Sequence, residues 1–125
     1  MRIVFGLLTS LGVLLAGPAM PQEAPAFSTR VGDMPFDEAR LNSDVVGATH
    51  EFFDGGRSFF SISGSYSYTY PDGGIAYGTY ELRDQGVVCT FFRHGFERCD
   101  LYVENAGRVV LINAAGDRFP VRDLS

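Results

Sequence analysis

From Ala48 onward the chain alternates short hydrophobic runs with tight turn sequences. The runs are rich in Phe, Tyr, Val, Ile and Thr, and Gly-Gly, Pro-Asp-Gly-Gly, Asp-Gln-Gly, His-Gly, Asn-Ala-Gly and Ala-Gly-Asp separate them. Such a pattern is typical of strands joined by hairpin turns. It predicts about eight strands, near residues 48–54, 57–63, 65–70, 75–83, 87–92, 96–104, 108–113 and 118–122. Connections this short allow only antiparallel neighbours, so the predicted topology is a meander.

A weak helical pattern precedes the strands, from Phe36 to Val46. Leu41 and Val45 are spaced for one helical face, Pro35 precedes the segment and Gly47 follows it. Proline at the start and glycine after the end are the usual boundaries of a helix. We therefore expect one short helix.

A meander of this kind must close, be covered or carry charge on its edges. Eight short strands with one helix predict a mainly β fold, a small antiparallel up-and-down barrel, closed or half open, with the helix plugging an end. An interior of this size is filled by side chains or holds one small ligand. An outer-membrane barrel is disfavoured, because its strands need about 9–11 residues with an apolar outward band, whereas the outward positions expected here include Arg98, Asp100 and Glu104.

The two cysteines test the register of one hairpin. With Arg93-His94-Gly95 as a three-residue loop, Cys89 falls opposite Cys99, close enough for a disulfide. The same register predicts an apolar inner face and an outer face that carries charge. The inner face holds Val87, Phe91, Leu101 and Val103, and the outer face holds Arg98, Asp100 and Glu104.

An unusual aromatic stretch, FFSISGSYSYTY, runs from Phe59 to Tyr70. Its tyrosines fall on one side and its hydroxyl-bearing serines and threonine on the other. A two-residue Gln85-Gly86 turn would place Tyr80 beside Phe91, and an Asp72-Gly73-Gly74 loop would place Tyr66 beside Tyr80. Tyrosine suits ligand pockets and protein interfaces, although tyrosines that only line the core would give the same pattern. The candidate ligand-binding residues are Tyr66, Tyr68, Tyr80 and Phe91.

The N-terminal segment has the features of a secretory signal peptide. Arg2 is followed by an apolar stretch, Ile3 to Leu15, and then by small residues. We expect a signal peptide over residues 1–19, cleaved after Ala19 or alternatively after Ala26, and a flexible lead-in over residues 20–35. Residues 36–125 then form a single small β domain, which is exported to the periplasm or secreted. In an oxidising compartment the two cysteines are expected to pair.

Composition narrows the classes of partner. The net charge is −5, and removal of residues 1–19 takes away one arginine and no acid, which leaves −6. An acidic chain disfavours nucleic acid and anionic lipid as partners. We expect a monomer with no membrane span in the mature chain.

Little in the sequence indicates catalysis. His94 falls at a hairpin tip, and His50 is followed by Glu51, whose side chain points to the opposite face of a strand. Nucleophile motifs, phosphate loops and nucleotide fingerprints are absent from the sequence. With the cysteines paired, the ligands for a metal are too few. We expect a protein that is not an enzyme and has no metal or cofactor.

Several segments of the chain resemble small exported proteobacterial proteins of unknown function. The residues that carry the resemblance are the Gly78-Thr79-Tyr80-Glu81-Leu82 run, Cys89, Cys99, Leu101-Tyr102-Val103, Leu111-Ile112-Asn113 and Arg118-Phe119-Pro120-Val121. The resemblance implies a shared helix, a Gly-x-Tyr strand and two spaced cysteines, over about residues 36–121.

Two functional hypotheses follow from the sequence. The first is a binding module that holds a small apolar or aromatic ligand. The second is a protein-interaction or inhibitor protein of the cell envelope, because exported inhibitors of proteases and lysozyme are small disulfide-linked β-barrels. The Ser-Gly-x-x-Tyr signature of periplasmic lysozyme inhibitors is not matched, since Ser63-Gly64-Ser65-Tyr66 puts the tyrosine one residue early. A purely structural envelope protein is the third possibility.

Overall fold

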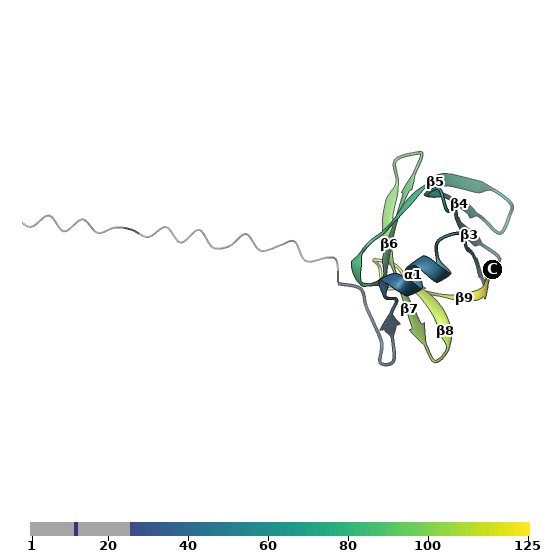
Figure 1. Ribbon diagram of the computed structural model, residues 1–125. Helices are drawn as coiled ribbons and strands as arrows, with labels where there is room; N and C mark the ends of the chain where they lie inside the picture. The colour runs from purple at the N-terminus through teal and green to yellow at the C-terminus, as the bar shows by residue number, and fades with distance from the viewer. Residues whose placement is uncertain (1–11, 13–25) are drawn as a thin grey trace, which may run out of the picture.

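The computed structural model describes Gly12 and residues 26–125 (Figure 1). The expected signal peptide and the first part of the lead-in lie outside the described residues, apart from Gly12. Within the described part, the chain forms an antiparallel barrel with one additional short strand and one helix. In chain order the elements are β1 (Met34–Pro35), α1 (Glu38–Asp44), β2 (Thr49–Phe52), β3 (Arg57–Phe60), β4 (Ser65–Thr69), β5 (Ile75–Leu82), the 3-10 turn η1 (Asp84–Gly86), β6 (Val87–Phe92), β7 (Glu97–Asn105), β8 (Arg108–Ile112) and β9 (Arg118–Leu124).

The barrel is closed by the pairing of its first and last strands. β2 to β9 follow one another as an antiparallel meander, and β9 then pairs with β2. Thr49 and Ser125 extend this closure with two backbone hydrogen bonds of 2.7 and 3.0 Å. The predicted mainly β meander is therefore confirmed, and of the two predicted forms the closed one is present.

Helix α1 lies across one end of the barrel (Figure 1). Asp37 caps its start by accepting a hydrogen bond from the Arg40 backbone N–H at 2.7 Å. Gly47, with a φ of +77°, turns the chain from the helix into β2, and its N–H donates to the carbonyl of Phe60. The helix thus plugs the end at which η1 lies, and the hairpin loops at residues 53–56, 70–74, 93–96 and 113–117 surround the open end.

The core has one part inside the barrel and one part outside it. The inner cluster joins the buried face of α1 to inward-facing aromatic and aliphatic side chains from seven of the barrel strands: Phe36, Leu41, Val45, Phe52, Phe60, Tyr66, Tyr80, Val88, Tyr102 and Leu111. The outer cluster lies on the opposite face of β7 and β8 and includes Leu101, Val103, Val110 and Ile112. Phe27 packs on this outer cluster, so the N-terminal segment covers it.

Asp33 attaches that segment to the barrel. Its fully buried carboxylate accepts two hydrogen bonds of 2.8 Å from the Arg118 guanidinium, one of 2.8 Å from Asn105 and one of 2.7 Å from the backbone of Arg30. The hydrogen bonds from Arg118 lower the pKa of Asp33 well below its usual value. Residues 26–35 of the expected lead-in therefore make defined contacts with the barrel.

The register of the β6–β7 hairpin confirms the predicted disulfide. Cys89 lies opposite Cys99, the two residues are bonded, and Gly95 in the loop has a φ of +94°. The predicted register of the β5–β6 hairpin is wrong by one residue. Its loop contains Asp84 as well as Gln85 and Gly86, so Tyr80 pairs with Thr90 and not with Phe91.

The extra loop residue exchanges the faces of two strands, because neighbouring strand residues point to opposite sides. Phe91 lies on the outside of the barrel, while Arg98 and Asp100 share the inward face of β7 with buried Tyr102. The prediction that Arg98 and Asp100 point outward is therefore wrong. The expected Tyr66–Tyr80 pairing is also wrong, because the β4–β5 loop sets Tyr66 opposite Gly78.

Gly78 provides a test of the barrel geometry. A Cβ atom at this position would lie 2.2 Å from the backbone oxygen of Phe91, which cannot move independently of β6. Gly78→Ala is expected to lower the free energy of unfolding by about 1–3 kcal/mol, as for other overpacked cores. Chemical denaturation followed by circular dichroism measures the change. Thr79→Ala, on the exposed face of the same strand, is the control, and equal stability of the two variants would contradict this close packing.

Candidate ligand-binding site at the open end of the barrel

Two charged side chains on β7 lie inside the barrel, toward its open end. The Arg98 Nε and Asp100 Oδ2 atoms are 3.0 Å apart, as an ion pair whose angle is not that of a hydrogen bond. The Asp100 side chain is 4% exposed and that of Arg98 is 36% exposed. Burial raises the pKa of Asp100 above its usual value, and the Arg98 charge opposes this increase.

The surrounding layer is polar but only partly satisfied. Ser58 and Tyr66 share a hydrogen bond of 2.9 Å. By contrast, the Thr90 hydroxyl, Asp100 Oδ1 and Arg98 Nε are buried without a hydrogen-bond partner among the described residues. Most buried polar atoms in folded proteins have a partner. Three of the four without one in the described part of the chain lie in this layer, and the fourth is His50 Nδ1.

This layer is adjacent to a gap between β7 and β8. β8 pairs with β7 only from Leu101 to Asn105, whereas β7 begins at Glu97. Residues 97–100 consequently have β6 on one side and no paired strand on the other. The 4.0 Å separation of the Cys89 and Cys99 Cα atoms is typical of a pair without mutual hydrogen bonds, so the N–H and C=O of Cys99 point toward the gap.

A cavity of about 100 Å³ occupies the open end of the barrel. Phe52, Leu111 and Phe119 form its apolar wall, and Tyr68, Arg98, Asn113 and Asp54 add polar groups. Asp54 Oδ1 accepts a 2.8 Å hydrogen bond from the Gly56 N–H within its own turn. The absence of a side chain at Gly56 makes room for Tyr68, because a Cβ there would lie 2.1 Å from the Tyr68 hydroxyl oxygen. We name this the mouth cavity.

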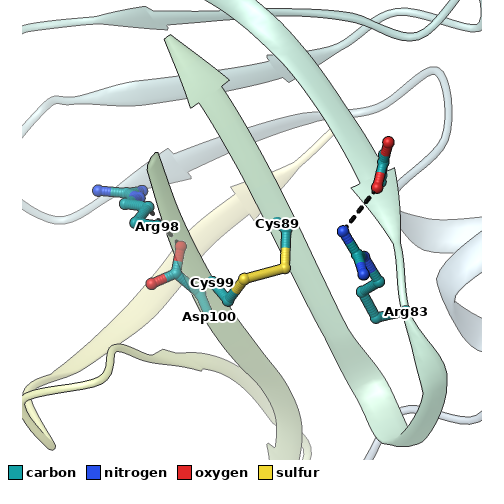
Figure 2. The surroundings of a disulfide bond; sticks show 6 residues. Arg83, Cys89, Arg98, Cys99 and Asp100 are labelled. Carbon is teal, nitrogen blue, oxygen red and sulfur yellow. Dashed lines mark hydrogen bonds and ion pairs between the residues drawn. A yellow bond between two sulfur atoms is a disulfide. The ribbon is translucent and has the colours of Figure 1, made fainter. Parts of the chain in front are cut away.

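A wider groove of about 650 Å³ lies on the outside of the barrel next to the same gap. The disulfide, Phe91 and Phe96 line it together with the Asn113–Ala115 loop. Figure 2 shows Arg98 and Asp100 on β7 beside the Cys89–Cys99 bond. Arg98 and Asn113 border both the groove and the mouth cavity, so the two spaces meet at the gap.

The structure separates the four candidate residues predicted from the sequence. Tyr66 and Tyr80 are buried in the interior, where the ring centroids of both lie 5.1 Å from that of Phe60. The Tyr80 hydroxyl donates to the carbonyl of Ser61 at 2.6 Å. Tyr68 borders the mouth cavity, and Phe91 lies outside in the groove. Burial raises the pKa of Tyr66, Tyr68 and Tyr80.

Arg98 and Asp100 are not among the site residues predicted from the sequence. The predicted register places both on the outer face, with the apolar residues of β7 inside. The signal that could have found them is the alternation along β7, where Arg98 and Asp100 precede the large aromatic Tyr102 on one face. Both faces of this strand carry apolar residues, so the sequence did not indicate which face lies inside.

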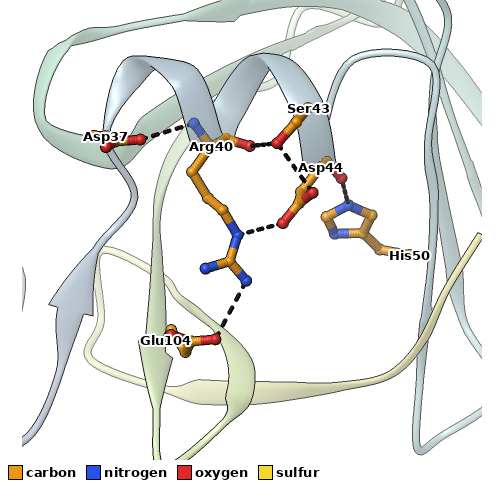
Figure 3. Close-up of polar contacts among 6 residues, drawn as sticks. All are labelled: Asp37, Arg40, Ser43, Asp44, His50 and Glu104. Carbon is orange, nitrogen blue, oxygen red and sulfur yellow. Dashed lines mark hydrogen bonds and ion pairs between the residues drawn. The ribbon is translucent and has the colours of Figure 1, made fainter.

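His50 lies away from this site, under the helix (Figure 3). It is fully buried, its Nε2 lies 2.7 Å from the carbonyl oxygen of Asp44, and its ring meets Phe60 and Tyr102 edge-on. Because a carbonyl can only accept, Nε2 carries the proton. Burial lowers the pKa of His50 below its usual value, against the opposing hydrogen bond to Asp44. Its position is that of a neutral core residue holding the helix.

Arg40 ties the other side of helix α1 to strand β7 (Figure 3). It forms an ion pair with Asp44, and a second of 3.4 Å with Glu104 on β7. The prediction that Glu104 points outward is therefore wrong as well. Its side chain is directed to the end of the barrel that the helix covers, on the same face of β7 as Tyr102.

Comparison with known proteins adds no relative. No family model matches the chain, and no curated protein or solved structure is significantly similar to it.

Two further searches of the described residues gave negative results. Among residues 26–125 no three His, Cys, Asp or Glu side chains are grouped in a way that could hold a metal ion. None of the helices in this part of the chain has the length and hydropathy needed to cross a membrane.

The burial of His50 predicts that the folded protein loses stability in mild acid. Because its pKa in the folded protein lies below the ordinary 6.5, the unfolded chain takes up a proton first as the pH falls. The contribution of His50 is complete above about pH 7 and decreases below pH 6.5, by at most about 1.4 kcal/mol per pH unit. Urea denaturation at pH 7.5, 6 and 5 measures it. His50→Gln should show a smaller difference across these pH values, and an unchanged difference would assign the effect to other groups.

The Arg98–Asp100 pair predicts a non-additive response to mutation. Asp100→Ala leaves Arg98 without its counter-charge and is expected to lower the free energy of unfolding by about 2 kcal/mol. The loss is smaller than for a fully buried pair because Arg98 is partly solvated. The double variant Arg98→Met with Asp100→Leu should recover most of this loss. Denaturation of the single and double variants measures the coupling. Additive losses would show that the two charges do not interact.

Proposed function

We propose that this protein is a non-enzymatic binding module of the periplasm or extracellular space, which holds an apolar or aromatic ligand group in the mouth cavity. The observation that carries the proposal is the cavity itself, at the open end of a barrel whose other end is plugged. Its apolar wall is joined to a few converging polar groups, which is the usual composition of a small-molecule site.

The size of the cavity limits what enters it. A drug-sized ligand needs about 300–1,000 Å³, whereas the mouth cavity measures about 100 Å³. The interior beneath it is filled by the rings of Phe60, Tyr66 and Tyr80, with the Phe60 ring packed against both tyrosine rings. The ligand would therefore insert one group, about the size of a single ring, and leave the rest of its body at the surface.

Exposed aromatic residues on the loops and strand ends around the opening support this arrangement. Phe53, Tyr70, Phe96 and Phe119 are 61%, 48%, 57% and 40% exposed, on four different segments at the open end. Export fits the same proposal, since the N-terminal segment resembles a signal peptide and the disulfide suits an oxidising compartment.

A protein partner is the second candidate, and the gap between β7 and β8 favours it. Among the described residues, no backbone hydrogen bond joins Glu97 or Cys99 to the β8–β9 loop. An extended segment of another protein could add to this free edge and place its side chains in the groove beside Phe91 and Phe96. Inhibition of lysozyme or protease activity by the purified protein is the measurement for this candidate.

The proposed function predicts binding of a neutral aromatic probe. 4-Methylphenol should give saturation-transfer NMR signals with the protein, and Phe119→Ala should weaken its affinity about tenfold, because about 1.4 kcal/mol of apolar contact is lost. Ile62→Ala, at the opposite end of the barrel, should bind as the wild type does. Native mass spectrometry of protein recovered from cells would then give the mass of a natural ligand. Absence of probe binding to the wild type would overturn the proposal.

A further inference from the structure

We propose that the ligand whose apolar or aromatic group enters the mouth cavity is a monoanionic acid, and that its carboxylate is anchored by the Arg98 guanidinium at the edge of the cavity. This inference rests on the proposed function and names the class of ligand. It is drawn from the hydrogen-bonding capacity that the residues around the cavity leave unused.

Arg98 has most of its donors free. Only its Nε approaches Asp100, and neither terminal nitrogen makes a hydrogen bond to a described residue. A guanidinium presents two parallel N–H groups at its end, in the geometry that a carboxylate accepts. With 36% of its side chain exposed at the junction of the mouth cavity and the groove, Arg98 can be reached from solvent.

Asp100 holds the guanidinium in place. The carboxylate of Asp100 is fixed on the same strand and almost completely buried, so Arg98 cannot swing out without leaving it unpaired. Because the Asp100 carboxylate lies on the Nε side of the guanidinium as an ion pair, a second carboxylate would bind at the terminal nitrogens. An anchor restrained in this way loses less conformational entropy on binding than a free surface arginine.

Tyr68 supplies a second donor on the facing side of the cavity. Its hydroxyl lies against Gly56 and makes no hydrogen bond to a described residue. Phe52, Leu111 and Phe119 border the same space, so a carboxylate bound by Arg98 and Tyr68 would have its carbon body on an apolar wall. Two donors and an apolar wall match an organic acid better than they match an inorganic anion.

Asp54 sets the charge of the ligand. It lies at the edge of the cavity with one carboxylate oxygen in its own turn, and Asp100 is a second negative charge deeper in the barrel. Arg98 is the one cation among the residues that line the cavity, so a second negative charge on the ligand would meet these carboxylates with no cation to offset it. The site should therefore prefer a monocarboxylate to a dicarboxylate or a phosphate ester.

The test compares ligands of one shape and different charge. Phenylacetate, phenylacetamide and phenylmalonate are titrated into the purified protein and followed by NMR. Phenylacetate is expected to bind at least tenfold more tightly than the amide, and phenylmalonate more weakly than phenylacetate. Arg98→Gln should abolish the preference for the acid while binding of the amide remains. Arg108→Gln, at the opposite end of the barrel, is the control that should keep it.

Further variants keep the test decisive if Arg98→Gln does not fold. Arg98→Gln combined with Asp100→Asn removes both charges together and should also lose the preference. Tyr68→Phe removes one donor with little change in volume and should weaken phenylacetate about threefold to tenfold, in line with the loss of one hydrogen bond to a charged group. Equal binding of acid and amide by the wild type would overturn the inference and leave the proposed function standing. Binding of neither compound, nor of 4-methylphenol, would overturn both.

Discussion

The pairing of β9 with β2 is the constraint on which the rest of the structure depends. Once the meander closes, every strand residue faces either a narrow interior or the outside, and eight strands leave an interior that side chains can fill. Closure also removes the free edges of the sheet, apart from the first part of β7. Helix α1 then seals one end, with His50 beneath it and Arg40 tied to Glu104, so only the opposite end stays open to solvent.

The candidate site arises from unequal strand lengths. β7 runs from Glu97 to Asn105, whereas β8 ends at Ile112, and β7 therefore extends beyond its neighbour at the open end. The wall opens where Arg98 and Asp100 face inward, so a polar layer lies next to both the mouth cavity and the outer groove. The disulfide ties this extended part of β7 to β6, which supports the strand where β8 cannot.

Hydrophobic alternation and turn sequences were enough to predict the strands, the meander, the short helix and the Cys89–Cys99 bond. The sequence could not define which face of each strand lies inside, because that depends on the length of each loop. Asp84 lengthens the β5–β6 loop by one residue, and Gln85 there takes a φ of +61°, which a residue other than glycine rarely adopts. Because of the added loop residue Asp84, Phe91 lies outside the barrel and not in the predicted site. Tyr66 and Tyr80 lie in an aromatic interior, where each ring meets that of Phe60, but Tyr66 lies opposite Gly78 and not opposite Tyr80.

The polar layer is difficult to explain by stability alone. An apolar residue at Asp100 would avoid the desolvation of a carboxylate that Arg98 compensates through a single ion pair. The Thr90 hydroxyl has no partner in the described part of the chain, so its burial also lowers stability, by less than that of a carboxylate. Just beneath this layer, Phe60, Tyr66 and Tyr80 show that this barrel can pack its interior with aromatic rings. Among the described residues, three of the four buried polar atoms without a hydrogen-bond partner lie where the wall is open, and the fourth, His50 Nδ1, lies under the helix. We infer that the three at the opening are retained for a group that binds from outside.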